Sequence, residues 1–311
     1  MPITSEEEPS SEARVGSSSG GSGEDAPPTR RIAVALGSSF LGYFAHAGFL
    51  VGMQERGIQP VAISGSSAGA IAGGLYAGGL RGEDLREFIC SRKLLDSFAD
   101  FGMTFRIPAV LLGLRNAGLL RAHRAVRLLR ELVNGQQIED LNDPIFLPAA
   151  SDLTTGESLL LREGDLAQAI VASCAVPGLF RGQQFAGRIL HDGGVADEAP
   201  IDQWLDDPMI DEIIVHRVLS TPDPKSTSAP KKSGFPLFRY PFAACHSLVG
   251  EEILRYRAEL CEARGKSIHI VSSHHPRPRP FPPQKTAPFF DTGKATALAL
   301  WDKSATNNTL E

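Results

Sequence analysis

The pentapeptide Gly65-Ser66-Ser67-Ala68-Gly69 sets a serine between two glycines, at a spacing that can present a nucleophile. An apolar stretch precedes it, and a run of small residues typical of a helix follows. In such a strand-to-helix turn the central residue takes a strained conformation that projects its side chain, and the flanking glycines keep Cβ atoms out of the corner. The helix N-terminus would favour negative charge at the same place. We therefore predict that Ser67 is a nucleophile on an elbow formed by Gly65 and Gly69; the alternative is a simple packing turn.

A second candidate lies at the end of another apolar segment, where Asp192 is followed by Gly193 and Gly194. A carboxylate in a loop without bulky neighbours can accept the proton of Ser67 directly if the fold brings the two together. On its own this tripeptide is only a turn signal. His191 precedes Asp192 in the strand and is expected to point to the opposite face. Histidine is the usual base for a serine, but the pattern gives structural or solvated positions to the others: His46, His123, His216, His269, His274 and His275.

These residues need elements to position them, and from residue 31 onward short apolar runs alternate with helical stretches. Apolar runs of this kind are typical of strands buried on both faces. Strands are expected at residues 31–36, 60–64, 145–150, 158–162, 188–191, 212–218 and 267–271. Helices are expected at residues 43–56, 68–77, 122–133, 165–173, 248–264 and 292–303. The alternation predicts one α/β domain over residues 31–311, with Pro-rich surface loops at 221–236 and 274–285.

Four motifs in this order resemble those of the patatin-like phospholipase family, which are lipid acyl hydrolases. They are the Ser67 pentapeptide, the hairpin at residues 152–156, the segment Ala-Ser-Cys-Ala-Val-Pro-Gly at 172–178, and the Asp192 loop. The resemblance covers about residues 31–218. It implies a three-layer α/β/α sheet sandwich and a Ser/Asp dyad, with Ser67 as nucleophile, Asp192 as base, and Gly193 and Gly194 in the proton acceptor loop. It implies no cofactor and no metal.

The same resemblance implies an oxyanion hole in the loop Gly-Ser-Ser-Phe-Leu-Gly at residues 37–42. Members of the family usually carry G-G-G-x-[RK]-G here, so Ser38 and Ser39 replace two glycines and Leu41 replaces the basic residue; adiponutrin-like members carry a similar Phe-Leu-Gly sequence. Backbone N–H donors tolerate serine where φ is negative, whereas a position with positive φ would be strained. We expect the hole to be formed by Gly37, Ser38, Ser39 and Gly42.

The charge distribution argues against nucleic acid as a partner. The formal net charge of -5 is concentrated in residues 1–30, where Glu6, Glu7, Glu8, Glu12, Glu24 and Asp25 outnumber Arg14 and Arg30. The nearly neutral remainder lacks the basic surface that binds a nucleic-acid backbone, so no nucleic acid is expected as a partner. Residues 1–30 are rich in Ser, Gly and Glu and poor in apolar side chains, which predicts a disordered tail. It would be a solvated leader or an export or targeting signal.

The compartment follows from cysteine usage and apolar patterning. The four cysteines lie far apart, without the spacing of a disulfide framework or a zinc site, which favours a cytoplasmic protein. No apolar run reaches the length of a membrane span, and the acidic N-terminus is unlike a secretory signal.

Aromatic and basic residues at 231–242 would suit a peripheral contact with a membrane, and residues 101–120 would suit a cap over an acyl pocket. Core packing is the alternative for both.

The leading hypothesis is a serine acyl hydrolase whose substrate is a phospholipid or lysophospholipid ester. Two alternatives stay open: a catalytically weak or silent lipid-binding or regulatory protein on the same fold, and an acyltransferase in which an alcohol replaces water. A fluorophosphonate probe separates the first alternative from the hydrolase, because only an activated serine reacts with it.

Overall fold

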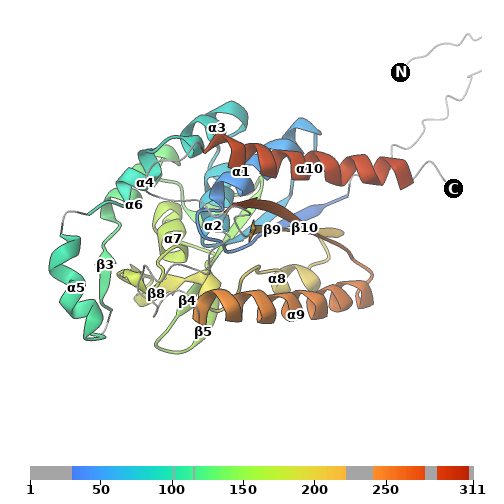
Figure 1. Cartoon of the computed structure of the whole chain (residues 1–311). Coiled ribbons are helices and arrows are strands. Elements are labelled where there is room, and N and C mark those ends of the chain that lie inside the picture. The colour runs from blue at the N-terminus through green and yellow to red at the C-terminus, as the bar shows by residue number, and fades with distance from the viewer. Residues whose placement is uncertain (1–29, 101, 115, 222–240, 277–285, 308–311) are drawn as a thin grey trace, which may run out of the picture.

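The computed structural model describes residues 30–100, 102–114, 116–221, 241–276 and 286–307. Its centre is an eight-stranded sheet with the order β10-β9-β1-β2-β4-β8-β7, and β5 pairs with β4 off this path (Figure 1). The strands are β1 (Ile32–Leu36), β2 (Ala62–Ser66), β4 (Ile145–Asp152), β5 (Glu157–Leu160), β7 (Gln183–Phe185), β8 (Arg188–Asp192), β9 (Glu212–Thr221) and β10 (Ser267–Pro276). The strands from β10 to β4 pair in parallel, whereas β5, β8 and β7 are added by antiparallel pairing.

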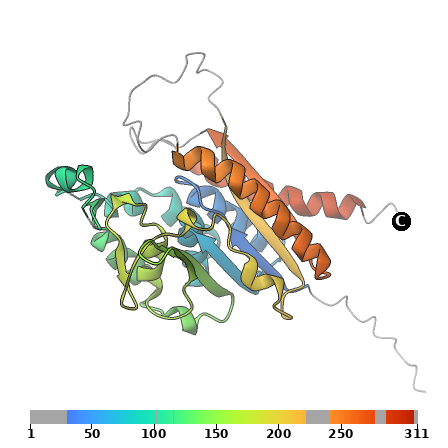
Figure 2. The ribbon, with the colours of Figure 1, turned by 90° about the horizontal axis from the view of Figure 1, so that it is seen from below.

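Helices cover both faces of this sheet, which confirms the predicted three-layer α/β/α arrangement (Figures 1 and 2). Strand β1 shows why both faces are buried: Val34 and Leu36 belong to one hydrophobic core, and Ala33 and Ala35 belong to the other. The larger core lies beneath α1 (Tyr43–Glu55), α2 (Ala68–Ala77), α7 (Leu166–Ser173) and α10 (Ala287–Asn307). The smaller core lies beneath α8 (Asp202–Leu205) and α9 (Pro241–Ala263).

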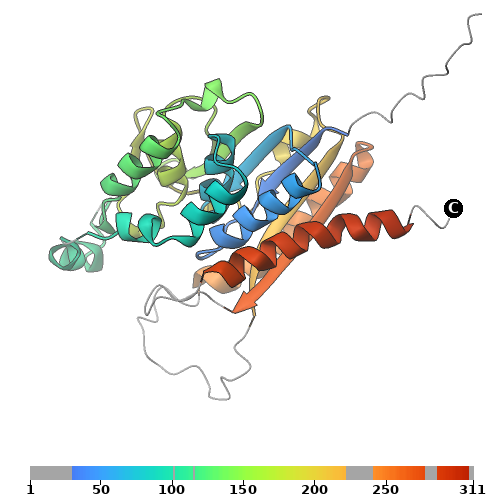
Figure 3. The same cartoon turned by 90° about the horizontal axis from the view of Figure 1, so that it is seen from above.

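A smaller layer of elements extends the molecule beyond α2 (Figure 3). It contains α3 (Gly82–Cys90), α4 (Lys93–Ser97) and α6 (His123–Leu132). Beside them β3 (Gly118–Leu120) and β6 (Gly178–Phe180) form a separate two-stranded parallel sheet, and α5 (Met103–Leu111) stands at the margin of the molecule. Single 3-10 turns lie at Ile138–Asp140 and Gly193–Val195. The sequence patterns did not predict α3, α4, α5, α8 or the short strands β3, β6 and β7.

Helices α1 and α10 approach each other more closely than larger side chains would permit. A methyl group on Gly48 of α1 would lie 1.9 Å from the carbonyl oxygen of Phe290, and one on Gly293 of α10 would lie 1.8 Å from the carbonyl oxygen of Ala45. Only glycine leaves room for such backbone contact. The contact fixes α1, which begins immediately after the loop at residues 37–42.

The structure corrects the predicted limits of two Pro-rich loops. Strand β9 continues to Thr221, and β10 continues through His274, His275 and Pro276, where a surface loop was predicted. Proline is tolerated there because β10 lies at the edge of the sheet, where a missing N–H leaves no neighbouring strand unpaired. Helices α9 and α10 begin earlier than expected, at Pro241 and Ala287.

Three sequence predictions lie outside the described residues. They are the tail at residues 1–29, the aromatic segment at 231–240, and the parts of the two Pro-rich segments that follow Thr221 and Pro276. No helix in the described part of the chain has the length and apolarity needed to cross a bilayer.

Candidate active site

The predicted elbow forms where β2 ends at Ser66 and α2 begins at Ala68. Ser67 stands between them with φ 53° and ψ -112°, a conformation that costs a non-glycine residue energy and projects its side chain off the strand end. Both flanking glycines are required by close packing. A methyl group on Gly65 would lie 2.6 Å from the carbonyl oxygen of Gly69, and one on Gly69 would lie 2.0 Å from that of Leu36.

The pairing of β8 beside β4 carries Asp192 to this elbow. The hydroxyl Oγ of Ser67 donates a hydrogen bond of 2.6 Å to Oδ2 of Asp192, and the backbone N–H of Gly194 donates one of 2.8 Å to Oδ1. The backbone of Asp192 is also held, because its N–H donates to the carbonyl of Ala175 and its carbonyl accepts from the hydroxyl of Ser151. The carboxylate therefore has one oxygen fixed by the loop and the other directed at the serine.

Burial controls the acidity of Asp192. The residue is only 4% exposed, and this burial raises the pKa of its carboxyl group to about 6, against the lowering effect of the hydrogen bonds from Ser67 and Gly194. The group is thus mainly ionised at neutral pH, yet it binds a proton more readily than an exposed aspartate does. Such a pKa suits a general base that must accept a proton and release it again.

The residues after α7 support the backbone of the nucleophile. The N–H of Ser67 donates to Oγ of Ser173 at 3.0 Å, and Sγ of Cys174 donates to the carbonyl of Ser67 at 3.1 Å. The N–H of Ser67 is therefore occupied, whereas the N–H groups of Ala68 and Gly69 belong to the first turn of α2 and have no acceptor within the helix. The sequence argument included Ser173 in a motif without giving it a role, since nothing in its spacing indicates this contact.

The loop at residues 37–42 is partly used for structure. The N–H of Gly37 donates to the carbonyl of His216 at 3.0 Å, and the N–H of Ser38 donates to the carbonyl of Glu198 at 2.7 Å. These two predicted oxyanion donors instead attach the loop to β9 and to the segment after β8. Within the part of the chain that the structure describes, the N–H groups of Ser39 and of the three residues that follow it have no acceptor.

The two serines of this loop are accommodated without backbone strain. Neither Ser38 nor Ser39 has a positive φ, whereas Leu41, which stands where the family usually has a basic residue, has φ 55°. The side chain of Ser38 fills the space beside the proton acceptor loop, because a methyl group on Gly194 would lie 2.1 Å from Oγ of Ser38. The side chain of Ser39 lies against Gly42 in the same way.

A series of three buried hydrogen bonds holds Gly37, at the start of this loop. Nε2 of His46 bonds the carbonyl of Gly37 at 2.9 Å, Nδ1 of His46 bonds Nδ1 of His216 at 2.9 Å, and Nε2 of His216 bonds the hydroxyl of Ser273 at 2.8 Å. A carbonyl only accepts, so the proton of His46 must be on Nε2, and His216 must then donate through Nδ1 and accept from Ser273. Both imidazoles are neutral, and burial lowers the pKa of His46 to about 3 and that of His216 well below its usual value.

The other histidines do not take part in the hydrogen bonds of Ser67 or Asp192 in the described structure. His191 lies beside Gly182, while its neighbour Asp192 reaches Ser67, which confirms the predicted opposite orientations. His269 forms an ion pair of 3.2 Å with Glu212. His275, predicted to lie in a solvated loop, is buried within β10.

Comparisons with known proteins find relatives over the part of the chain that contains Ser67 and Asp192. Residues 34–205, more than half of the chain, match the patatin-like phospholipase family. An uncharacterized NTE family protein of Mycobacterium tuberculosis is 35% identical over 175 residues, which are 55% of this chain and 44% of that protein. The lysophospholipase NTE1 of Cryptococcus neoformans is 28% identical over 186 residues, 60% of this chain and 11% of that protein. The chain thus spans less than half the length of these curated relatives.

Among solved structures, VipD from Legionella pneumophila is similar in fold. Its TM-score is 0.51 at 15% sequence identity, and the alignment covers 89% of this chain and 67% of that one. At this level of identity the likeness concerns the fold alone, and it agrees with the layered α/β architecture.

Proposed function

Because the chain belongs to the patatin-like phospholipase family, we propose that it hydrolyses the ester bonds of phospholipids or lysophospholipids with Ser67 as nucleophile and Asp192 as base. The observation that carries the proposal is the 2.6 Å hydrogen bond from Ser67 Oγ to the buried carboxylate of Asp192. The choice of a lipid ester follows from the family and from the name of the NTE1 relative, a lysophospholipase.

The reaction has two halves. In the first, Oγ of Ser67 attacks the ester carbonyl while Asp192 accepts the hydroxyl proton, and the alcohol leaves with that proton as the acyl-enzyme forms. In the second, Asp192 accepts a proton from water, the resulting hydroxide attacks the acyl-enzyme, and the proton returns to Ser67 as the fatty acid is released.

Backbone donors hold the oxyanion in both halves. The N–H of Ala68 follows the nucleophile at the start of α2, where the positive end of the helix dipole favours negative charge. The N–H of Ser39 is the first donor of the 37–42 loop without an acceptor in the described structure. We assign the hole to these two groups, with Gly37 and Ser38 fixing the loop.

The test is fatty acid release from phosphatidylcholine and lysophosphatidylcholine by wild type, Ser67→Ala and Ser66→Ala. We expect Ser67→Ala to lose activity by at least about a thousandfold, because the attacking group is gone. Ser66→Ala is the matched control: its hydroxyl is buried and has no hydrogen-bond partner among the described residues, so its loss should leave activity within about threefold. Full activity in folded Ser67→Ala protein would refute the proposed nucleophile.

The same assay distinguishes the two alternatives. Acyl transfer to an added alcohol at the expense of free fatty acid would indicate an acyltransferase. The strained Leu41 and the two N–H groups already used in the 37–42 loop favour the weak or silent lipid-binding protein. That reading predicts a wild-type protein that binds vesicles and releases no fatty acid.

A further inference from the structure

Helix α5 has the reverse of the usual orientation for a helix on a protein surface. None of its residues is buried, and the large apolar side chains are the exposed ones: Phe105 is 87% exposed, Leu111 64% and, just after the helix, Leu112 74%. Its one charged residue, Arg106, is turned inward, where it binds Asp100 through contacts of 2.8 and 3.0 Å and also the carbonyl of Leu119. Large apolar side chains exposed together on one short helix indicate an interaction site.

A basic pocket lies close to this helix. It has a volume of about 520 Å³ and is lined by Arg121, His123, Arg127, Arg130 and Arg181, with Asn116, Val126, Gln168 and the segment 182–184. Only Arg130 is neutralised, through a contact of 2.7 Å with Asp165. In the part of the chain that the structure describes, the guanidinium groups of Arg121, Arg127 and Arg181 have no carboxylate partner.

The pocket and the helix are joined by short, hydrogen-bonded connections. Asn116, which follows α5 by a few residues, accepts a hydrogen bond of 2.6 Å from the N–H of Gly182 at the pocket wall. The N–H of Arg181 donates to the carbonyl of Leu120 at 2.9 Å, which couples the end of β3 to the pocket. The elements that carry the apolar side chains and the pocket are therefore joined, and α5 stands outermost at this end of the molecule (Figures 1 and 3).

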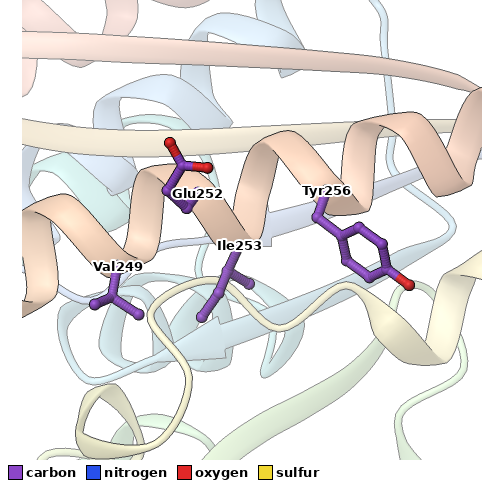
Figure 4. Close-up of a pocket in the computed structure, with 4 residues that line it drawn as sticks. All are labelled: Val249, Glu252, Ile253 and Tyr256. Carbon is purple, nitrogen blue, oxygen red and sulfur yellow. The ribbon is translucent and has the colours of Figure 1, made fainter.

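A second exposed apolar patch, on α9, has different surroundings. Val249, Ile253 and Tyr256 form an apolar stripe on that helix, and the carboxylate of Glu252 points away from Val249 and Ile253 (Figure 4). The neighbouring acids Glu251 and Glu252 face Arg217 and Arg255, so the charges described beside this patch largely cancel. This patch serves below as the matched control.

We propose that α5 and the pocket of Arg121, Arg127 and Arg181 together dock the protein on an anionic lipid bilayer. The apolar side chains of α5 enter the boundary between headgroups and acyl chains, while the arginines bind lipid phosphate. An anionic bilayer is the occupant that offers both an apolar layer and dense negative charge at adjacent depths. The inference goes beyond the proposed function and does not depend on catalysis.

Docking would also bring the candidate active site to the membrane. β6 pairs with β3, and the chain that enters β6 comes directly from Ser173 and Cys174, which contact Ser67. Val176 and Leu179 on this connection are 38% and 37% exposed. Exposed apolar side chains thus lie on the short segment that joins the docking surface to the residues contacting Ser67.

The test measures vesicle binding in the Ser67→Ala background, so that hydrolysis does not alter the vesicles. The probes are phosphatidylcholine vesicles with and without about a quarter phosphatidylglycerol. We expect Arg121→Gln/Arg181→Gln to weaken binding to the anionic vesicles by about 25-fold, roughly fivefold per arginine, with no change on pure phosphatidylcholine. Phe105→Ser/Leu112→Ser should weaken binding to both kinds of vesicle at least about tenfold.

The control Ile253→Ser/Arg255→Gln on α9 should leave both affinities unchanged. Unaltered binding in the α5 and arginine variants, or a loss only in the α9 control, would overturn the proposal. Saturable binding of glycerol phosphate without vesicle binding would overturn it in favour of a soluble phosphate ligand. A second assay separates this proposal from the proposed function. The docking variants, made with Ser67 present, are tested on a dispersed short-chain ester, which needs no membrane. If the proposed function fails, vesicle binding remains intact.

Discussion

Asp192 is a buried carboxylate, and the described residues place no cation beside it, whereas buried charges are usually paired. Its two hydrogen bonds stabilise the ionised form only in part, so burial still raises the pKa to about 6. The carboxylate is therefore less stable in the fold than in water. A structure that tolerates this cost at one position offers a base for the adjacent hydroxyl.

The pH profile should reflect this titration. Because Asp192 must be ionised to accept the proton of Ser67, we expect kcat/KM to rise about tenfold per pH unit below pH 6 and to level off above pH 7. Initial rates on a dispersed ester between pH 4.5 and 8 give the profile. Asp192→Asn should be inactive throughout. A flat profile in a protein that stays folded would assign the base to another group.

The contact between Ser38 and Gly194 gives a second test at the residue scale. Gly194→Ala should reduce kcat by at least about tenfold, chiefly because its methyl group would lie 2.1 Å from Oγ of Ser38 and displace that side chain. Ser38→Gly removes the obstructing side chain, so the double variant Ser38→Gly/Gly194→Ala should recover most of the lost activity. Equal losses in the single and double variants would show that the two loops are not coupled through this contact.

At the residue scale the sequence pointed to Ser67 and Asp192, because glycine spacing and strand ends are local signals, and the structure places the two side chains in contact. Their roles as nucleophile and base stay a proposal. The sequence was insufficient for the oxyanion loop. The N–H groups of Gly37 and Ser38 are engaged by carbonyls of His216 and Glu198, and these partners are more than a hundred residues away in the chain. No local pattern reports which donors are occupied by such distant acceptors.

At the scale of elements, the two buried histidines connect α1, β9 and β10. The acceptor at Gly37 fixes the proton of His46 on Nε2, so a proton added to Nδ1 of His46 would meet the N–H of His216. A proton on either imidazole also places a charge in a buried region. His46 and His216 are 0% exposed. The arrangement is therefore stable only while both rings are neutral.

Stability should consequently fall in acid. The unfolded chain binds protons at these histidines below about pH 6.5, whereas folded His46 resists protonation until about pH 3, so lowering the pH through this window favours the unfolded state. Each histidine contributes about 1.4 kcal/mol of lost stability per pH unit. Urea unfolding of wild type and His216→Gln at pH 8, 6 and 5 measures it.

The comparison of the two slopes removes the opposing contribution of Asp192, whose raised pKa stabilises the folded state as the pH falls toward 4. We expect the free energy of unfolding of His216→Gln to change less with pH, by about the contribution of one histidine, although this variant is less stable at pH 8. Identical slopes would mean that the buried pair is not the source of the pH dependence.

Apolar periodicity predicted the main elements because each buried strand and amphipathic helix has its own pattern. It failed where the position of an element in the fold decides whether a residue type is tolerated there. Pro276 is acceptable in β10 only because that strand has β9 as its one neighbour. Similarly, the apolar residues of α5 were attributed to a cap or to core packing, and core packing is wrong because none of them is buried.

At the scale of the whole molecule, the carboxyl ends of the parallel strands β1 and β2 lead into the 37–42 loop and the Ser67 elbow. Antiparallel β8 brings Asp192 to the same edge, as expected for a ligand site in an α/β sheet. The proposed docking surface is attached to this edge through β6. The fold thus places the proposed catalytic pair at the edge of the sheet and the proposed docking surface at the margin beside it.

Reaction with a fluorophosphonate, followed by mass spectrometry to locate the adduct, is the most direct test of the proposed Ser67 and Asp192 pair. The probe forms a stable bond only with a serine that is deprotonated by a nearby base and faces an oxyanion hole. Wild type should carry a single adduct on Ser67, Ser67→Ala should carry none, and Asp192→Asn should react at least about a hundredfold more slowly. An adduct on a different serine, or no adduct in folded wild-type protein, would contradict the account.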